Sequence, residues 1–247
     1  MIPLAHMLRA ELTKTFTLRS IQTTIAAALV VPAALSLASG FAFDPSRSAH
    51  FPLESHGFET AGFGQPLVIL LAALIAGAEY LDGQMRSTLL VTPRRGRVLA
   101  AKLLVTGVLA AVIGLVATGT SVLLKHAALG EHGIPVSDFT PAMGWNLLGV
   151  GLNYALIATI AAGITVIFRT FIVTLVVLVP LVLGVTISLV GIIPTLKFLP
   201  DLAGIQLLMP YPGVGLLSPL PGAVVMGCWA LVTSCFAWVL IRKRDSS

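Results

Sequence analysis

Residues 78–103 read AEYLDGQMRSTLLVTPRRGRVLAAKL and lie between two long apolar runs of the chain. This stretch contains seven of the 25 acidic and basic residues in the sequence. Ionised groups left in hydrocarbon cost several kcal/mol each, so such a short charged interruption must reach water or a protein partner. The flanking runs therefore predict two membrane spans joined by a short polar segment. We interpret this segment as the functional surface of the chain.

The composition is that of an integral membrane protein. Hydrophobic residues make up 57% of the 247 positions, charged residues make up 10%, and the mean hydropathy is +0.99. No polar stretch is long enough to fold as a soluble domain. We therefore expect a single transmembrane domain over residues 1–247, with no catalytic or nucleotide-binding domain.

The apolar runs predict an all-α fold with six transmembrane helices, because about 20 apolar residues cross the hydrocarbon core. The predicted spans cover residues 21–43, 62–82, 93–124, 143–168, 171–193 and 222–241. Little more than Arg169 and Thr170 separates the fourth span from the fifth, which predicts a tight helical hairpin. Pro180 lies within the fifth span and is expected to kink it.

Two further segments are predicted to be helical without crossing the membrane. Within residues 1–20, an apolar stripe recurs at Leu4, Leu8, Leu12 and Phe16, which is typical of an amphipathic helix in the membrane interface. Residues 191–222 contain six prolines among apolar pieces. This segment is too apolar for a solvated loop and too broken for a span, so we expect short re-entrant or interfacial helices.

The positions of lysine and arginine predict the orientation. If the N-terminus is cytoplasmic, twelve of the fifteen basic residues lie on the cytoplasmic side, and the exceptions are Arg47, Lys125 and Lys197. Both termini are therefore predicted to be cytoplasmic, in a multi-pass cell or inner membrane protein. This sorting explains the net charge of +5 through lipid headgroups and a cytosolic partner, and not through nucleic acid.

The second half of the central stretch begins a helix. Thr92 can cap free amides and Pro93 suits the first helical position. Arg94, Arg95 and Arg97 then lie in the first turn, where the helix dipole disfavours basic side chains. Anionic headgroups, an acidic partner surface, or membrane topology alone each explain these arginines.

The first half of the central stretch ends the second span. Glu79 and Asp82 close the span, Gly83 can break the helix, and residues 84–91 are predicted to form a short helix on the cytoplasmic face. This helix mixes apolar residues with Arg86 and Thr88. A short helix tied to two spans can transmit a push from a soluble motor to the bundle.

These residues resemble the segment between spans two and three in permease subunits of ATP-binding-cassette (ABC) exporters of the type-2 class. The resemblance also covers the six-span layout, the N-terminal helix and the broken segment before the last span. Gln84 departs from the threonine that often follows the glycine. The matching positions are Glu79, Gly83, Thr88, Leu89, Leu90, Pro93, Arg94, Arg95, Arg97, Val98, Leu99, Ala100 and Lys102.

The resemblance implies a coupling helix that docks on a separate nucleotide-binding subunit. It also implies that two permease copies or paralogues form the pathway for a small or amphipathic substrate such as a drug, peptide or lipid. The chain has no GxxxxGK phosphate-binding motif, so ATP and Mg²⁺ are expected on the partner subunit and no cofactor on this non-catalytic chain. The expected docking residues are Glu79, Asp82, Gly83, Arg86, Thr88, Leu89, Leu90, Pro93, Arg94, Arg95, Arg97 and Lys102.

Polar side chains within the spans are candidates for a substrate path. Each of them also has a structural interpretation, as an interhelical hydrogen bond or a bond back to its own helix. The candidates are Asn153, Tyr154, Thr159, Thr165, Thr174, Thr186 and Ser188. We expect no ionisable side chain deep in a span, which disfavours a self-powered carrier. A stand-alone channel or carrier, or a membrane scaffold, is the alternative to the exporter.

One group in the first outer loop resembles a metal site only loosely. His50, Glu54, His56 and Glu59 lie close together in the sequence, but their spacing matches no zinc-ligand pattern. A solvated loop explains these residues, and no metal site is predicted.

Overall fold

The structure is a computed structural model that describes residues 4–44, 52–81, 95–211 and 215–243. Over these residues the chain is helical and contains no strand. Six helical segments are long and apolar enough to cross a membrane, so the prediction of an all-α, six-span fold is confirmed. The long helices are α2 (Arg19–Phe41), α3 (Ala61–Leu81), α5 (Arg95–Leu129), α6 (Pro141–Phe168), α7 (Phe171–Pro180) continued by α8 (Thr186–Leu189), and α10 (Pro219–Lys243).

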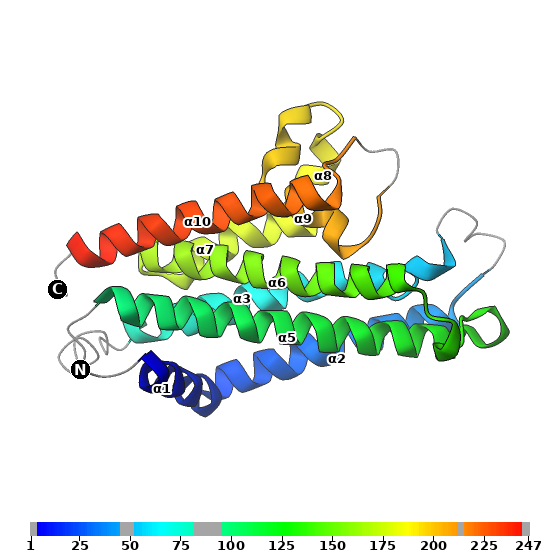
Figure 1. Ribbon diagram of the computed structural model, residues 1–247, viewed down its shortest axis with the longest axis horizontal. Coiled ribbons are helices and arrows are strands. Elements are labelled where there is room, and N and C mark those ends of the chain that lie inside the picture. The colour runs from blue at the N-terminus through cyan, green and yellow to red at the C-terminus, as the bar shows by residue number, and fades with distance from the viewer. Residues whose placement is uncertain (1–3, 45–51, 82–94, 212–214, 244–247) are drawn as a thin grey trace.

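The long helices lie side by side as a bundle, with both chain ends at the same end of it (Figure 1). Helix α5 packs mainly against α6 and α2, and α6 also packs against α10 and α3. This places α6 in the interior, where 13 of its 28 residues are buried. An even number of crossings returns the chain to the side on which it began.

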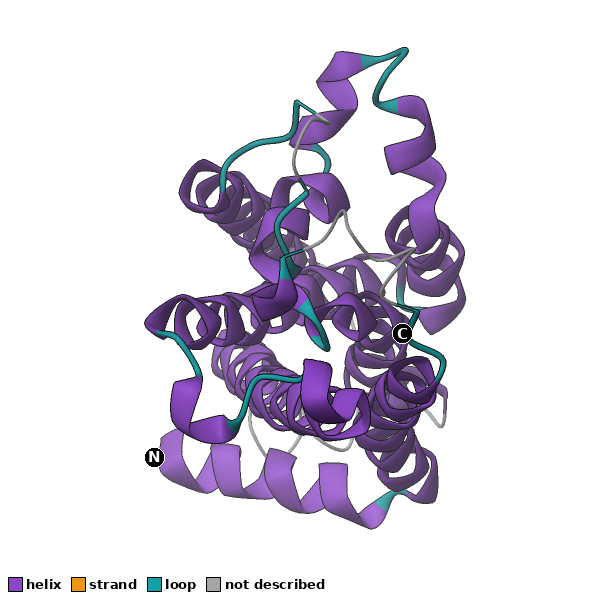
Figure 2. Ribbon diagram, turned by 90° about the vertical axis from the view of Figure 1, so that its right-hand side faces the viewer, coloured by secondary structure: helices purple, strands orange, loops and turns teal. Residues whose placement is uncertain are grey.

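The first helix, α1 (Leu4–Thr17), lies crosswise to the long helices at the end that carries both termini (Figures 1 and 2). Met7, Glu11 and Thr15, spaced one turn apart, are its buried face. Leu12 and Phe16 of the predicted apolar stripe are exposed. Leu8 is partly buried, so Leu12 and Phe16 are the part of the stripe that is free to contact lipid, and the interfacial position of α1 stays a prediction.

The predicted hairpin between α6 and α7 is present and has a local cause. Arg169 ends α6 with φ 55°, in the left-handed region that reverses the chain. Thr170 follows and accepts a hydrogen bond from the backbone amide of Ile172, which caps α7. Two residues are therefore enough to turn one span into the next.

The predicted kink near Pro180 is present as the segment η5 (Leu181–Val185), which has π-type hydrogen bonding and a non-helical backbone at Gly184. Pro180 has no amide hydrogen, so the regular hydrogen-bond ladder is interrupted there. Gly184 adopts φ 111°, which favours glycine. The segment from α8 to the 3₁₀ helix η6 (Pro194–Phe198) then projects from the side of the bundle (Figure 1, yellow).

The broken segment before the last span returns to the bundle as helix α9 (Pro200–Leu208). Seven of its nine residues are buried, and it packs against α10 and α6. Trp229 of α10 donates its indole N–H to the carbonyl of Phe198 at 2.8 Å, which fixes the entry to α9. A short helix covered by protein on several sides is what a re-entrant segment requires.

The centre of the bundle is built around Tyr154 of α6, which is fully buried. Its hydroxyl donates to the carbonyl of Ala61 in α3 at 2.6 Å. A Cβ atom at Gly114 would lie 2.9 Å from the Tyr154 ring, and one at Gly64 would lie closer still to its hydroxyl. Glycine at these two positions therefore lets α3 and α5 approach the ring.

Candidate functional site

The predicted docking residues that the structure describes lie in α3 and α5, at the end of the bundle that carries both termini (Figure 1). Asp82, Gly83, Arg86, Thr88, Leu89, Leu90, Pro93 and Arg94 lie outside the described residues. Glu79 belongs to the last turns of α3, and Arg95, Arg97 and Lys102 belong to the first turns of α5. The structure therefore shows the two helices that enter and leave the segment, with Arg97 exposed.

Lys102 makes a buried ion pair instead of facing solvent. Its Nζ lies 2.9 Å from Oε2 of Glu11 in α1, and both side chains are 6% exposed. The same ammonium group donates to the carbonyl of Ile75 in α3 at 3.1 Å. One cation thus links α1 to α5 and α3, the two helices that flank residues 82–94.

The ion pair lies beside a small cavity of about 120 Å³ between α1, α3 and α5. Lys14 lies 3.2 Å from the other oxygen of Glu11 and is 45% exposed at the side chain. The sequence analysis did not predict this contact between Glu11 and Lys102.

The polar side chains of the fourth span are engaged with other helices. Asn153 Oδ1 accepts from Gln65 of α3 at 2.8 Å, and its Nδ2 donates to the Gly204 carbonyl of α9 at 2.8 Å. Met226 of α10 lies 3.8 Å from the same Nδ2. Asn153 is fully buried, so in the single chain it joins helices, as the structural interpretation expected.

The threonines of the predicted path are similarly engaged. Thr165 and Thr174 share a hydrogen bond of 2.7 Å between α6 and α7. Thr159 donates to the carbonyl of Ala155, one turn earlier in its own helix. Ser188 is exposed, whereas Thr186 is buried against Asp201 of α9. The role of these residues in a substrate path stays a prediction.

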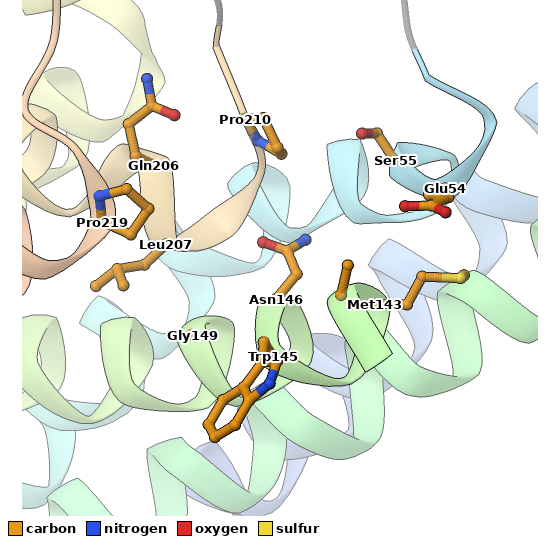
Figure 3. A pocket seen from close by; sticks show the side chains of 11 residues that line it. Glu54, Ser55, Met143, Trp145, Asn146, Gly149, Gln206, Leu207, Pro210 and Pro219 are labelled. Carbon is orange, nitrogen blue, oxygen red and sulfur yellow. The ribbon is translucent and has the colours of Figure 1, made fainter. Parts of the chain in front are cut away.

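A larger pocket opens at the other end of the bundle, between α6, α9 and the 3₁₀ helix η1 (Leu53–Ser55) (Figure 3). Its volume is about 510 Å³. Asn146 lies at its floor and donates to the Leu208 carbonyl at 3.2 Å, while Glu54 lies at one side and Gln206 at the other. The pocket combines apolar walls with one carboxylate and two amides.

Lys125 is a second buried lysine of α5, four residues before the end of the helix. The third span was predicted to end at residue 124, but α5 continues to Leu129, which carries Lys125 into the bundle. Its Nζ lies 3.0 Å from Glu59 and donates to the Ser39 hydroxyl at 2.7 Å.

Among the described residues, no group of three His, Cys, Asp or Glu side chains could hold a metal ion.

Comparison with known proteins identifies a family. A family model described as "ABC-2 family transporter protein" matches residues 7–187, from α1 into α8. This match covers more than half of the chain and includes residues 82–94. A search of curated proteins found no match.

Proposed function

Because the chain belongs to the ABC-2 family of transporter proteins and is thus a transmembrane subunit of an ABC transporter, we propose that it is the permease of an ATP-driven exporter. A separate ATPase subunit docks on residues 82–94, and ATP and Mg²⁺ bind to that subunit. The permease works with a second copy or a paralogue, and it moves a small or amphipathic molecule outward across the cell membrane.

The linkage of α1, α3 and α5 through Lys102 is the observation that supports coupling at this end of the bundle. The segment from residue 82 to residue 94 connects α3 directly to α5. A displacement of that segment moves both helices, and the buried Glu11–Lys102 pair makes α1 move with them. The proposed mechanism is therefore a rigid displacement of three connected helices, which is a known mode of switching.

The substrate class is proposed from the pocket at the opposite end. Apolar walls with a few polar groups are typical of small-molecule sites, and a volume of about 510 Å³ lies within their usual range. Glu54 at the rim favours a substrate that carries a positive charge. A stand-alone carrier or a scaffold, the alternative, would need no ATPase partner.

Reversing three arginines tests the docking site. We expect Arg94→Glu, Arg95→Glu and Arg97→Glu together to reduce co-purification of the ATPase subunit at least tenfold and to abolish substrate-stimulated ATPase activity. The control reverses Arg9, Arg19 and Lys243, which are exposed basic residues predicted to lie on the same membrane side. Equal retention of the ATPase subunit by both triple variants would contradict a docking role.

Cysteine labelling tests the orientation. Cys228 and Cys235 are free and exposed on α10, so both are first replaced by alanine. In intact cells, a membrane-impermeant maleimide should label Val136→Cys, at the predicted outer end, and should leave Ser87→Cys unlabelled until the membrane is opened. Val136 is 68% exposed, so its accessibility is not limiting. Labelling of Ser87→Cys in intact cells would refute the cytoplasmic position of the coupling segment.

A further inference from the structure

Asp201 is a buried carboxyl group in the segment that was predicted to form short re-entrant or interfacial helices. It is the second residue of α9 and is 5% exposed. Its Oδ2 accepts a hydrogen bond from the hydroxyl of Thr186, and its Oδ1 has no hydrogen-bond partner among the described residues. A side chain of this kind must be neutral or must find compensation for its charge.

Thr186 connects Asp201 to the irregular part of the fifth span. It is the first residue of α8, directly after the π-helical segment η5, and its hydroxyl also lies 3.3 Å from the carbonyl oxygen of Leu181. A hydroxyl has one hydrogen and cannot donate fully to two acceptors. A protonated Asp201 resolves this, because it donates to Thr186, and Thr186 donates to Leu181.

Few titratable or charged groups on the helices around α9 could compensate an ionised Asp201. The segments η5 and α8 contain none, and α6 contributes Tyr154, whose hydroxyl is bonded to Ala61. Lys197 of η6 lies with its Nζ 5.4 Å from the centre of the Phe198 ring. Helix α10 contributes Cys228, Cys235, and the distant Arg242 and Lys243 of its last turn.

The position of Asp201 in the first turn of α9 favours the ionised carboxylate, whereas burial favours the neutral acid. A carboxylate there gains typically about 0.3–1 kcal/mol from the helix dipole, and up to about 2 kcal/mol when partly buried. Burial of an unpaired charge costs several kcal/mol, so the cost of burial is larger. Burial raises the pKa of the Asp201 carboxyl, against smaller opposing effects of the Thr186 hydroxyl and nearby backbone amides.

We propose that Asp201 is a proton-binding site that holds α9 against the π-helical segment of the fifth span. With the proton bound, the chain of hydrogen bonds runs from Asp201 through Thr186 to Leu181. Loss of the proton leaves a buried carboxylate that competes with Leu181 for the Thr186 hydrogen and that draws water or a cation toward α9. The packing of α9 on α8 and η5 therefore depends on pH, with or without an ATPase partner.

Infrared difference spectroscopy of the purified full-length chain tests protonation directly. At pH 7 the wild type should show the C=O stretching band of a protonated carboxyl, and Asp201→Asn should lack it. Thr186→Val should shift the same band to higher wavenumber, because it removes the hydrogen-bond partner. Asp138→Asn is the control, since Asp138 is exposed beside Ser137 in the loop before α6.

The pH dependence of thermal unfolding gives an independent readout. An unfolded Asp201 loses its proton near its ordinary pKa of 3.8, whereas the folded carboxyl keeps it to higher pH. The wild type should therefore lose stability relative to Asp201→Asn as pH rises above about 4, until the folded pKa is passed. The two proteins should unfold at similar temperatures at pH 4, and Asp201→Asn should unfold several degrees higher at pH 8.

Two outcomes would overturn the proposal. One is the absence of a protonated-carboxyl band that depends on Asp201 and Thr186 at pH 7. The other concerns the difference in unfolding temperature between Asp201→Asn and wild type. If Asp201→Asn becomes less stable than wild type as the pH rises from 4 to 8, the native state needs the ionised carboxylate. If Asp201→Asn does not fold, the band shift in Thr186→Val decides the question alone.

Discussion

Replacing Lys102 by methionine is expected to detach α1 from the bundle. The substitution keeps the length of the side chain but leaves the Glu11 carboxylate, 6% exposed, with Lys14 as its nearest cation. Removing one partner of a buried ion pair typically costs about 3–5 kcal/mol. We therefore expect loss of substrate-stimulated ATPase activity and a much larger population of chains with α1 released.

Release of α1 can be measured at Thr15, which is 2% exposed on the face of α1 that contacts the bundle. In a background free of Cys228 and Cys235, maleimide should label Thr15→Cys about 100-fold faster in the Lys102→Met variant, since about 2.8 kcal/mol corresponds to a 100-fold change in population. The measurement requires only the purified permease.

Two matched variants distinguish the contribution of the Glu11–Lys102 ion pair to stability from the effect of removing any nearby positive charge. Lys14→Met removes a cation 3.2 Å from the same carboxylate, but one whose side chain is 45% exposed, so it should change stability by less than about 1 kcal/mol. Glu11→Leu combined with Lys102→Met removes both charges and should restore most of the stability. If the double variant is as unstable as Lys102→Met alone, the pair does not hold α1 in place.

The sequence predicts the helices of this fold better than it predicts which side chains of different helices contact each other. Six apolar runs, the short polar break at Arg169 and Thr170, and Pro180 within the fifth run are local signals, so the spans, the hairpin and the kink could all be recognised. The Glu11–Lys102 pair could not, because its members lie in different helices and no local pattern connects them. Lys102 was assigned to the docking surface from the resemblance to the exporter family, whereas in the fold its side chain is buried against Glu11.

Burial of polar groups is the second property that local patterns miss. The predicted orientation places Asp201 on the outer side of the membrane, and no local pattern shows that the packing of α9 on α6 and α10 buries it. The expectation of no ionisable group deep in a span holds for residues 103–124 of α5, but Lys102 and Lys125 are buried near its two ends. In both cases three-dimensional packing decides which charges lose contact with water.

Asn153→Leu is expected to be the most destabilising substitution in the interior of α6. Leucine fills a similar volume but leaves the Gln65 amide and the Gly204 carbonyl without their 2.8 Å partners. Hydrogen bonds between helices in membranes contribute about 0.6 kcal/mol on average, but an unsatisfied buried group costs about 1–3 kcal/mol. Two such groups predict a loss of about 2–6 kcal/mol, which corresponds to a decrease of about 4–24 °C in unfolding temperature for a chain of this size.

The same substitution separates the two interpretations of Asn153. If Asn153 only lines a substrate path, Asn153→Leu should unfold at the wild-type temperature and change transport alone. The control is Thr159→Val, further along the same helix. In the described part of the chain the Thr159 hydroxyl bonds only to the Ala155 carbonyl of α6, so its loss should change the unfolding temperature by less than about 2 °C. Adding Gln65→Leu to Asn153→Leu should recover part of the lost stability, because it removes one of the two unsatisfied groups. If Asn153 connects α3, α6 and α9, the effects of Asn153→Leu and Gln65→Leu on stability must be coupled in this way. If Asn153 faces an open path, no such coupling is expected.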